Sequence, residues 1–183
     1  QWAQVRTDNF KAWFGDWEND PANASKVVDE NGEPMVVYHG TEGDFNEFKP
    51  TEPNFYAITE GTYFFTDNEN VAANFGKYVM PVYLNIDNPT ELDGRNAGRF
   101  NTWELNDDSG NYGWIVENAD TGGGFATEYA VENPSQIKSA IGNNGEFNPT
   151  NPDIRFSRKA KNPINEGIKS AANDAKNSLP KPI

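Results

Sequence analysis

The one histidine of the chain is its most distinctive chemical group. His39 is the only histidine among 183 residues, and there is no cysteine. These counts exclude a disulfide framework, a cysteine nucleophile and a His-rich zinc site, and a Ser-His-Asp triad would have to use His39. His39 ends a short apolar run and is followed by Gly40 and Thr41. A glycine there lets a ligand approach the backbone, so a binding site is the functional interpretation and a structural histidine the alternative.

Acidic side chains are too numerous to mark a site. The chain has 28 Asp and Glu and 15 Lys and Arg, for a net charge of −13. Residues 1–152 carry 8 basic and 25 acidic groups, a net charge of −17, whereas residues 153–183 carry 7 and 3, a net charge of +4. An acidic body repels phosphate backbones. The charge therefore disfavours general nucleic-acid binding and is compatible with a basic protein partner or with a merely solubilising surface.

Near the N-terminus, residues 7–17 have the pattern of an amphipathic helix. Four aromatic residues recur at the i, i+3, i+4, i+7 spacing of one helical face: Phe10, Trp13, Phe14 and Trp17. Thr7 or Asp8 would supply the N-cap, and Gly15 with the polar residues after it ends the pattern. We interpret the aromatic stripe as core packing, with a groove for a partner as the alternative.

Four other segments have strand character: residues 35–38, 62–66, 78–86 and 125–131. Asp67 predicts the cap of a short helix that ends at Gly76. Residues 91–124 are rich in Gly, Asn and Asp and predict long loops around a short apolar patch. We expect one domain over residues 1–157 and a linker or weakly ordered tail over residues 158–183. No apolar run approaches the roughly 18 residues of a membrane span, and no signal peptide is apparent, so we expect a soluble domain.

Three short motifs follow one another along the chain. Residues 38–41 read Tyr-His-Gly-Thr, residues 64–75 run from Phe-Phe-Thr-Asp to Ala-Asn-Phe, and residues 127–131 read Thr-Glu-Tyr-Ala-Val. In order and spacing they resemble the His-Gly-Ser or His-Gly-Thr, the Tyr-Phe-Ala-Asp to Ala-Asn-Tyr, and the Asn-Glu-Tyr-Ile-Val motifs of ADP-ribosyltransferases. The resemblance is to the branch with a His, aromatic and Glu triad, which is shared by diphtheria-toxin-like enzymes and poly(ADP-ribose) polymerases.

The sequence on either side extends this resemblance. Residues 10–17, 136–139 and 151–157 are similar to ADP-ribosyltransferase domains of phage polyvalent proteins and polymorphic toxins, so the resemblance covers about residues 4–157. It implies an α+β fold with an ADP-ribosyltransferase-like split β-sheet core, flanking helices and long loops. It also implies NAD as the substrate, with no metal. From the lack of a long apolar run and from the acidic charge, we expect neither membrane binding nor general nucleic-acid binding.

The activity implied is that of a mono-ADP-ribosyltransferase, a glycosyltransferase that moves ADP-ribose from NAD to a macromolecule, with a protein as the expected acceptor. The relatives suggest a toxin or a phage effector that acts in an NAD-containing cytoplasm. Because the chain begins with Gln1 rather than Met, we expect it to be part of a longer protein that is delivered by a phage or by secretion. The sequence predicts neither the identity of the acceptor nor an oligomeric state.

The resemblance also assigns roles to individual residues. Glu128 would be catalytic: it would bind a ribose hydroxyl and stabilise the positive charge that grows as the bond between nicotinamide and ribose breaks. His39, the second catalytic residue, would donate a hydrogen bond to a ribose hydroxyl and orient the sugar. Gly40 and Thr41 would contact the carboxamide through backbone groups and a hydroxyl. A solvated strand glutamate is the alternative interpretation of Glu128.

An aromatic ring from the second motif would stack on nicotinamide. If the family motif is aligned at Asp67, its aromatic position falls on Phe64, whereas alignment at Gly61 places that position on Tyr63. Neighbouring residues of a strand point to opposite faces of the sheet, so only one of the two rings can stack on the nicotinamide. The match without a gap over residues 64–75 favours Phe64, and ordinary core packing is the alternative for both rings.

Two departures from the family pattern change these expectations. Ala126 stands two residues before Glu128, where arginine-directed members have Glu or Gln, so arginine is disfavoured as the target. Ala72 stands where the polymerases have a Ser that contacts the carboxamide, so one hydrogen bond to nicotinamide is expected to be missing. Two alternatives to transfer are an NAD glycohydrolase, with water as the acceptor, and a non-catalytic binding module with a degenerate NAD pocket.

Overall fold

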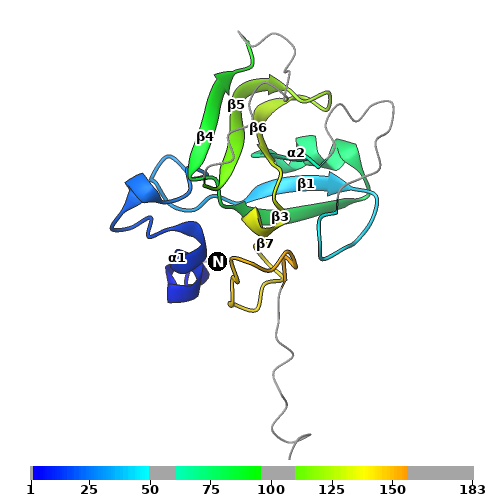
Figure 1. Cartoon of the computed structure of the whole chain (residues 1–183). Helices are drawn as coiled ribbons and strands as arrows, with labels where there is room; N and C mark the ends of the chain where they lie inside the picture. Colours follow the sequence, from blue (N-terminus) through cyan, green and yellow to red (C-terminus); the bar gives the residue numbers. More distant parts are fainter. Residues whose placement is uncertain (1, 50–60, 96–109, 156–183) are drawn as a thin grey trace, which may run out of the picture.

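The computed structural model describes residues 2–49, 61–95 and 110–155, and its centre is a mixed β-sheet of seven strands (Figure 1). The strands are β1 (Val37–Thr41), β2 (Tyr63–Thr66), β3 (Tyr78–Leu84), β4 (Asn88–Asp93), β5 (Tyr112–Asp120), β6 (Phe125–Val131) and β7 (Ile137–Ser139). The helices are α1 (Asp8–Phe14), α2 (Glu69–Ala72) and the 3-10 helices η1 (Gln4–Arg6), η2 (Pro21–Asn23), η3 (Ala73–Phe75) and η5 (Pro134–Gln136). This architecture confirms the predicted α+β class.

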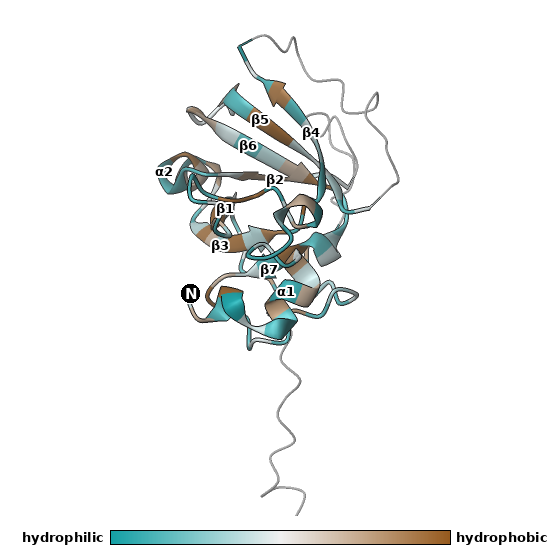
Figure 2. Cartoon of the chain, turned by 90° about the vertical axis from the view of Figure 1, so that its left-hand side faces the viewer, coloured by the Kyte–Doolittle hydropathy of each residue, from teal (hydrophilic) through white to brown (hydrophobic). Residues whose placement is uncertain are grey.

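The sheet is divided into two parts at the junction of β1 and β2. Its strand order is β4-β5-β6-β2-β1-β3-β7. β1 pairs with β3 along its whole length, from Val37 to Thr41, but it pairs with β2 at one position, where Tyr38 lies opposite Thr66. In Figure 2, β4, β5 and β6 lie on one side of this junction and β3 and β7 on the other. The predicted split sheet is present, and its opening lies between β1 and β2.

One core cluster holds the two parts together. It takes Val37 from β1, and Phe65 and Tyr129 from β2 and β6. The last two lie directly opposite each other on antiparallel strands, so their side chains share one face of the sheet. Phe48, from the loop after β1, and Ile154, near the end of the described chain, are buried in the same cluster. The walls of the opening are therefore fixed by segments far apart in sequence.

The prediction of long loops over residues 91–124 was wrong for most of its described part. β4 and β5 lie there and pair in parallel over six positions. Trp114 and Val116 of β5 are buried, but a bulge follows Val116, and Asn118 within it has a φ of 53°. The bulge and the Gly, Asn and Asp content hid the period of two that identifies a strand. Residues 96–109 lie outside the described part of the chain.

The predicted N-terminal helix is present as α1, which is shorter than the predicted residues 7–17 and ends before Trp17, and it packs into a second core cluster. The Thr7 hydroxyl accepts a hydrogen bond from the N–H of Phe10 and caps α1, which ends before Gly15, where φ is 97°. All four aromatic residues of the predicted stripe are buried: Phe10, Trp13, Phe14 and Trp17. The Phe10 ring contacts Tyr83 of β3 and Phe147, with centroids 5.1 and 4.9 Å apart. Core packing is therefore the correct interpretation of the stripe.

The cap of α2 differs from the prediction by one residue. Asn68, not Asp67, is the N-cap, and its side chain accepts hydrogen bonds from the N–H groups of Asn70 and Val71. The Asp67 carboxylate instead accepts a hydrogen bond from the N–H of Thr127 at 3.1 Å. Asp67 thus ties the end of β2 to β6, next to the predicted catalytic glutamate.

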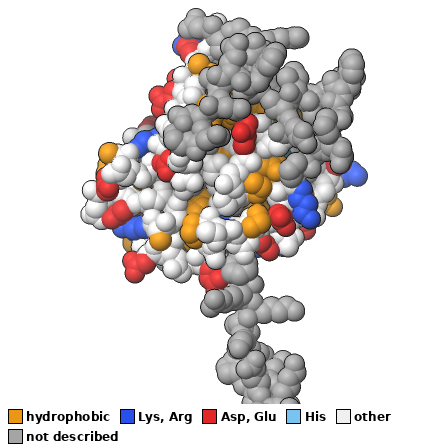
Figure 3. Space-filling view, viewed as in Figure 1, with side chains coloured by type: hydrophobic (Ala, Val, Ile, Leu, Met, Phe, Trp, Pro, Cys, Tyr) orange, Lys and Arg blue, Asp and Glu red, His pale blue; other side chains and the backbone are white. Residues whose placement is uncertain are grey.

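The surface agrees with the acidic composition. Figure 3 shows Asp and Glu side chains spread over one face, with fewer Lys and Arg among them. Within the described ranges, no helix is long and apolar enough to cross a membrane. The predicted tail over residues 158–183 lies outside the described residues, so the boundary at residue 157 stays a prediction.

Candidate active site

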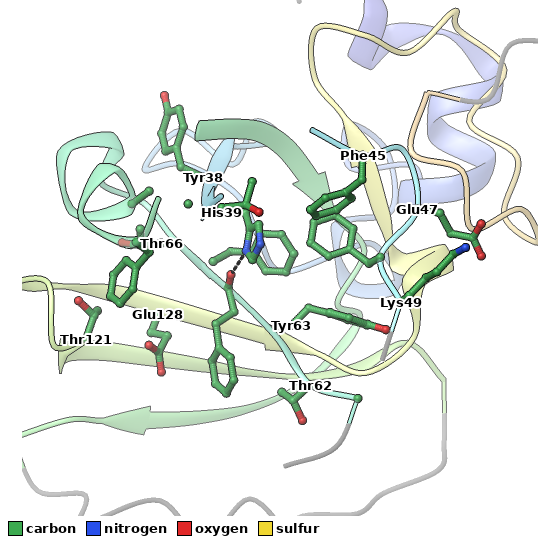
Figure 4. Close-up of a pocket in the computed structure, with 18 of the residues that line it drawn as sticks. Tyr38, His39, Phe45, Glu47, Lys49, Thr62, Tyr63, Thr66, Thr121 and Glu128 are labelled. Atoms are coloured by element: carbon green, nitrogen blue, oxygen red, sulfur yellow. Dashed lines mark hydrogen bonds between the residues drawn. The ribbon is translucent and has the colours of Figure 1, made fainter. Parts of the chain in front are cut away.

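A cavity of about 990 Å³ lies at the opening between β1 and β2. Its size is at the upper end of the range of small-molecule sites, roughly 300 to 1,000 Å³. The cavity is lined by every residue that the sequence assigned to a site: His39, Gly40, Thr41, Tyr63, Phe64 and Glu128. Figure 4 shows His39 between the glutamate on one side and the loop after β1 on the other. The fold therefore brings together three motifs that lie far apart in the sequence.

His39 joins the two parts of the sheet at the opening. Its Nδ1 lies 2.8 Å from the carbonyl oxygen of Phe64 on β2 (Figure 4). Because a carbonyl oxygen can only accept, Nδ1 carries the hydrogen in this contact. Burial lowers the pKa of His39, and the bond to Phe64 offsets this only in part, so the imidazole is neutral at pH 7. Nε2 therefore presents a lone pair, and it has no hydrogen-bond partner among the described residues.

Aromatic rings hold the imidazole in place. The centroids of Phe48, Phe65 and Phe45 lie 5.0, 5.4 and 6.3 Å from that of His39. Phe45 and Phe48 come from the loop after β1, and both line the cavity. The sequence assigned these two rings no role at the site, because their contact with His39 depends on how the loop folds back.

The packing around position 40 requires a glycine. A Cβ atom at this position would lie 1.9 Å from the carbonyl oxygen of Ala72 and 2.9 Å from the Cβ of Phe75. α2 and η3 therefore approach β1 so closely that no side chain fits between them. The sequence predicted a close approach by a ligand, and the structure shows a close approach by the protein backbone at the cavity wall.

The strand register determines which rings face Glu128. Thr66 lies opposite Glu128 and Phe64 lies opposite Ala130, so Phe64 and Glu128 are on the same face of the β2–β6 pair. Phe64 is 42% exposed, whereas Tyr63 is 8% exposed and packs against Phe48 on the other face, at a centroid distance of 5.2 Å. Both rings line the cavity.

Glu128 is half-buried and lacks a protein partner. It lies on β6 between Thr66 of β2 and Val116 of β5. Burial raises the pKa of Glu128, because the charged form loses solvation. Among the described residues, its carboxylate has no hydrogen bond or ion pair. A half-buried, unpaired carboxylate at a cavity wall is a group that a ligand can satisfy.

Phe75 is a cavity residue to which the sequence analysis gave no role. It lies at the end of η3 and is 49% exposed, and its ring reaches Gly123 in the turn between β5 and β6. The side chain of Asn74 donates a hydrogen bond to the carbonyl oxygen of Gly123 at 2.9 Å, which holds this turn against η3. The sequence did hold a signal for these two residues, because both belong to the Ala-Asn-Phe end of the second motif.

The family model described as ADP-ribosyltransferase in polyvalent proteins matches residues 29–147, more than half of the chain. The chain belongs to this family. No curated protein and no solved structure matched it. The matched part of the ADP-ribosyltransferase domain runs from before β1 to beyond β7 and contains all the predicted site residues. ADP-ribosyltransferases use NAD as their substrate, as the sequence analysis expected.

Segments outside the matched residues pack against them. α1 precedes them, and Ile154 follows them, yet both are packed into the core clusters. Within the described part of this domain, no group of three or more His, Asp or Glu side chains is placed to hold a metal ion.

Proposed function

We propose that this chain transfers a single ADP-ribose from NAD to a protein acceptor. The observation that carries the proposal is that His39, Phe64 and Glu128, from three different strands, line one cavity. Their chemistry suits cleavage of the bond between nicotinamide and ribose, which needs a hydrogen-bonding group for the sugar, a flat surface for the leaving group and an anion for the developing charge.

The nicotinamide ring stacks on Phe64, with Phe75 as a second apolar wall. These rings are 42% and 49% exposed, and a flat ligand ring would cover them in the offset geometry that aromatic pairs prefer. The backbone of Gly40 and the hydroxyl of Thr41 contact the carboxamide. Ala72 lies at the same wall and offers no hydroxyl, so this contact lacks the extra hydrogen bond that a serine would give.

Glu128 stabilises the transition state in its ionised form. The bond between the ribose C1 and the nicotinamide nitrogen breaks, and its electron pair leaves with nicotinamide, so positive charge grows on the ribose. The carboxylate opposes that charge from a preorganised, half-buried position, where electrostatic contacts are stronger than in water. A nucleophilic atom of the acceptor then bonds to the same carbon and loses its proton to solvent.

His39 orients the sugar by accepting a hydrogen bond. With Nδ1–H donated to Phe64, the neutral ring offers the Nε2 lone pair to a ribose hydroxyl. This role replaces the donor role expected from the sequence and likewise needs no proton transfer.

The acceptor is a host protein, and the chain acts as a toxin-type or phage effector in an NAD-containing cytoplasm. The match to a family found in polyvalent proteins supports this setting. The net charge of −17 over residues 1–152 favours a basic protein surface. Ala126 lies on the same strand as Glu128, two residues before it, and has no polar group to orient a guanidinium, so an acceptor residue other than arginine is favoured.

Incubation of the protein with labelled NAD and a cell lysate tests the proposal. We expect a labelled protein with the wild type and a decrease of about 10²- to 10³-fold with Glu128→Gln, because the preorganised charge is lost while the size of the side chain is kept. Equal labelling by the two proteins would discard the catalytic role of Glu128. Nicotinamide release without a labelled macromolecule would identify an NAD glycohydrolase. A folded protein that shows no NAD binding by calorimetry would identify a binding module.

A further inference from the structure

One positive charge stands out at the cavity. Lys49 is the only Lys or Arg in the sequence between Lys26 and Lys77, a stretch that includes β1, β2 and α2. It lines the cavity and is the last described residue of the loop after β1. Its ammonium group forms no ion pair with a carboxylate of the described residues, although Glu47 lines the cavity beside it. An available cation is notable in an acidic chain, because anions would otherwise be repelled.

A buried hydroxyl group faces the same end of the cavity. Tyr63 is 8% exposed, and its phenol oxygen is buried without a hydrogen-bond partner. Buried polar groups are nearly always paired, so an unpaired one indicates a missing partner. In Figure 4, this oxygen points toward the side where Lys49 and Glu47 lie, away from Glu128. Burial and the charge of Glu47 raise the pKa of Tyr63, so the phenol keeps its hydrogen and can donate it.

We propose that Tyr63 and Lys49 together bind the pyrophosphate of NAD. The phenol O–H donates a hydrogen bond to a phosphate oxygen, and the Lys49 ammonium pairs with the phosphate charge. This inference rests on the proposed function and extends it. It sets the direction of the dinucleotide, with the nicotinamide ribose at Glu128, His39 in between and the phosphates at the loop after β1. Tyr63 is then a substrate-binding residue through its hydroxyl, while Phe64 supplies the stacking ring.

Calorimetric titration with NAD, ADP-ribose and adenosine tests this subsite. We expect Tyr63→Phe to weaken the binding of NAD and ADP-ribose about tenfold or more, because a hydrogen bond to a charged group is lost. Lys49→Gln should weaken both about threefold to fivefold at low salt and less at high salt, since an exposed charge is screened. The affinity for adenosine, which has no phosphate, should be unchanged in both variants.

Lys77→Gln is the matched control. It removes the same charge from an exposed position outside the cavity, where the ammonium lies 3.9 Å from Glu42. We expect its affinity for NAD to stay within about twofold of the wild type, because it contacts no ligand.

The outcomes separate this inference from the function it extends. Wild type that binds NAD, together with Tyr63→Phe and Lys49→Gln variants that bind it equally well, would overturn the subsite and leave the proposed function intact. A Tyr63→Phe variant with a raised melting temperature and unchanged binding would show that the hydroxyl is an unpaired group without a ligand role. Equal losses for adenosine and ADP-ribose would indicate a structural effect and would also overturn the subsite. Wild type that binds no NAD would overturn both proposals.

Discussion

At the residue scale, burial shifts the pKa values of Glu128 and His39 in opposite directions. Burial raises the pKa of the carboxyl of Glu128 and lowers the pKa of the imidazole of His39, because in each case the charged form is disfavoured. The result is an imidazole that stays neutral at pH 7 and a carboxylate that is ionised at a cost in stability.

This tuning predicts the pH dependence of activity. Acidification protonates Glu128 and removes the anion that the transition state needs, so nicotinamide release should fall as the pH is lowered, through an apparent pKa above the ordinary value for glutamate of about 4.3. His39 should add no change between pH 7 and 8, since its pKa lies below its usual value. Initial rates from pH 5 to 8 measure this, and a rate that rises on acidification would contradict the assignment.

The same burial makes a prediction about stability. An acid whose pKa is raised in the folded state destabilises that state at any pH where it is ionised, and this cost disappears below the pKa of the unfolded chain, about 4.3. Glu128→Gln should therefore have a higher melting temperature than the wild type at pH 7, with a difference that shrinks toward pH 4. Glu91→Gln, at an exposed position of β4, should show no such difference. A lower melting temperature for Glu128→Gln at pH 7 would mean that the carboxylate has a stabilising partner.

His39, Phe64 and Glu128, which the sequence motifs single out, line one cavity in the structure. The motifs did not predict the bond from His39 to the carbonyl of Phe64, or the contact of Phe75 with the cavity. The first depends on how far β1 and β2 separate beyond the Tyr38 and Thr66 pair, and the second on how η3 packs against β1. A separation of that kind is set by packing between distant segments, which no local pattern encodes.

At the element scale, the cavity depends on the close contact between β1 and the α2 and η3 segment. Gly40 makes this contact possible, because a Cβ would lie 1.9 Å from the carbonyl oxygen of Ala72. Backbone is not free to yield in the way that the end of a flexible side chain can. The position of Phe75, and with it one wall of the cavity, is therefore determined by the glycine.

Gly40→Ala should displace this segment. We expect it to destabilise the fold by about 1 to 3 kcal/mol, as overpacking does, and to abolish measurable NAD binding. Gly43→Ala is the control, since nothing lies within 4 Å of a Cβ built at that position, just after β1. Thermal unfolding and calorimetry measure the two effects. Normal binding by Gly40→Ala would show that α2 and η3 do not form a rigid wall.

The elements differ in how well the sequence predicted them. α1 was predicted because its cap, its aromatic period and its terminal glycine are all local signals. β4 and β5 were missed because their parallel pairing joins separated segments and the bulge after Val116 breaks the alternation. The burial of Trp114 in a cluster with Val116 and Ala130 stabilises β5 in spite of its polar composition.

At the scale of the whole molecule, segments on both sides of the part that matches the family pack against it. The matched residues are 29–147, but Phe10 packs on Tyr83 from one side of this range and Ile154 joins the central cluster from the other. The backbone N–H of Ile154 also donates a hydrogen bond to Asn46, in the loop that carries the rings around His39. The sequence predicted the packing of α1 and the similarity of residues 151–157 to the family, but it did not predict the contact of Ile154 with the loop after β1.

These contacts make a prediction about truncation. A fragment of residues 29–147 should expose the apolar surface that α1 covers and lose the support of the loop after β1. We expect it to bind hydrophobic dyes and to unfold without a cooperative transition, whereas residues 1–155 should unfold cooperatively. A fragment 29–147 as stable as residues 1–155 would show that the flanking segments are dispensable.

The proposed function requires that His39, Phe64 and Glu128 contact one molecule of NAD. A crystal structure of the protein with NAD would show this contact, with Glu128→Gln used if the wild type consumes the substrate. The expected result is a nicotinamide ring stacked on Phe64, with the nicotinamide ribose within hydrogen-bond distance of the residue 128 side chain and a ribose hydroxyl donating to Nε2 of His39. NAD bound at another place, or bound in the cavity with its nicotinamide ribose remote from residue 128, would contradict the account.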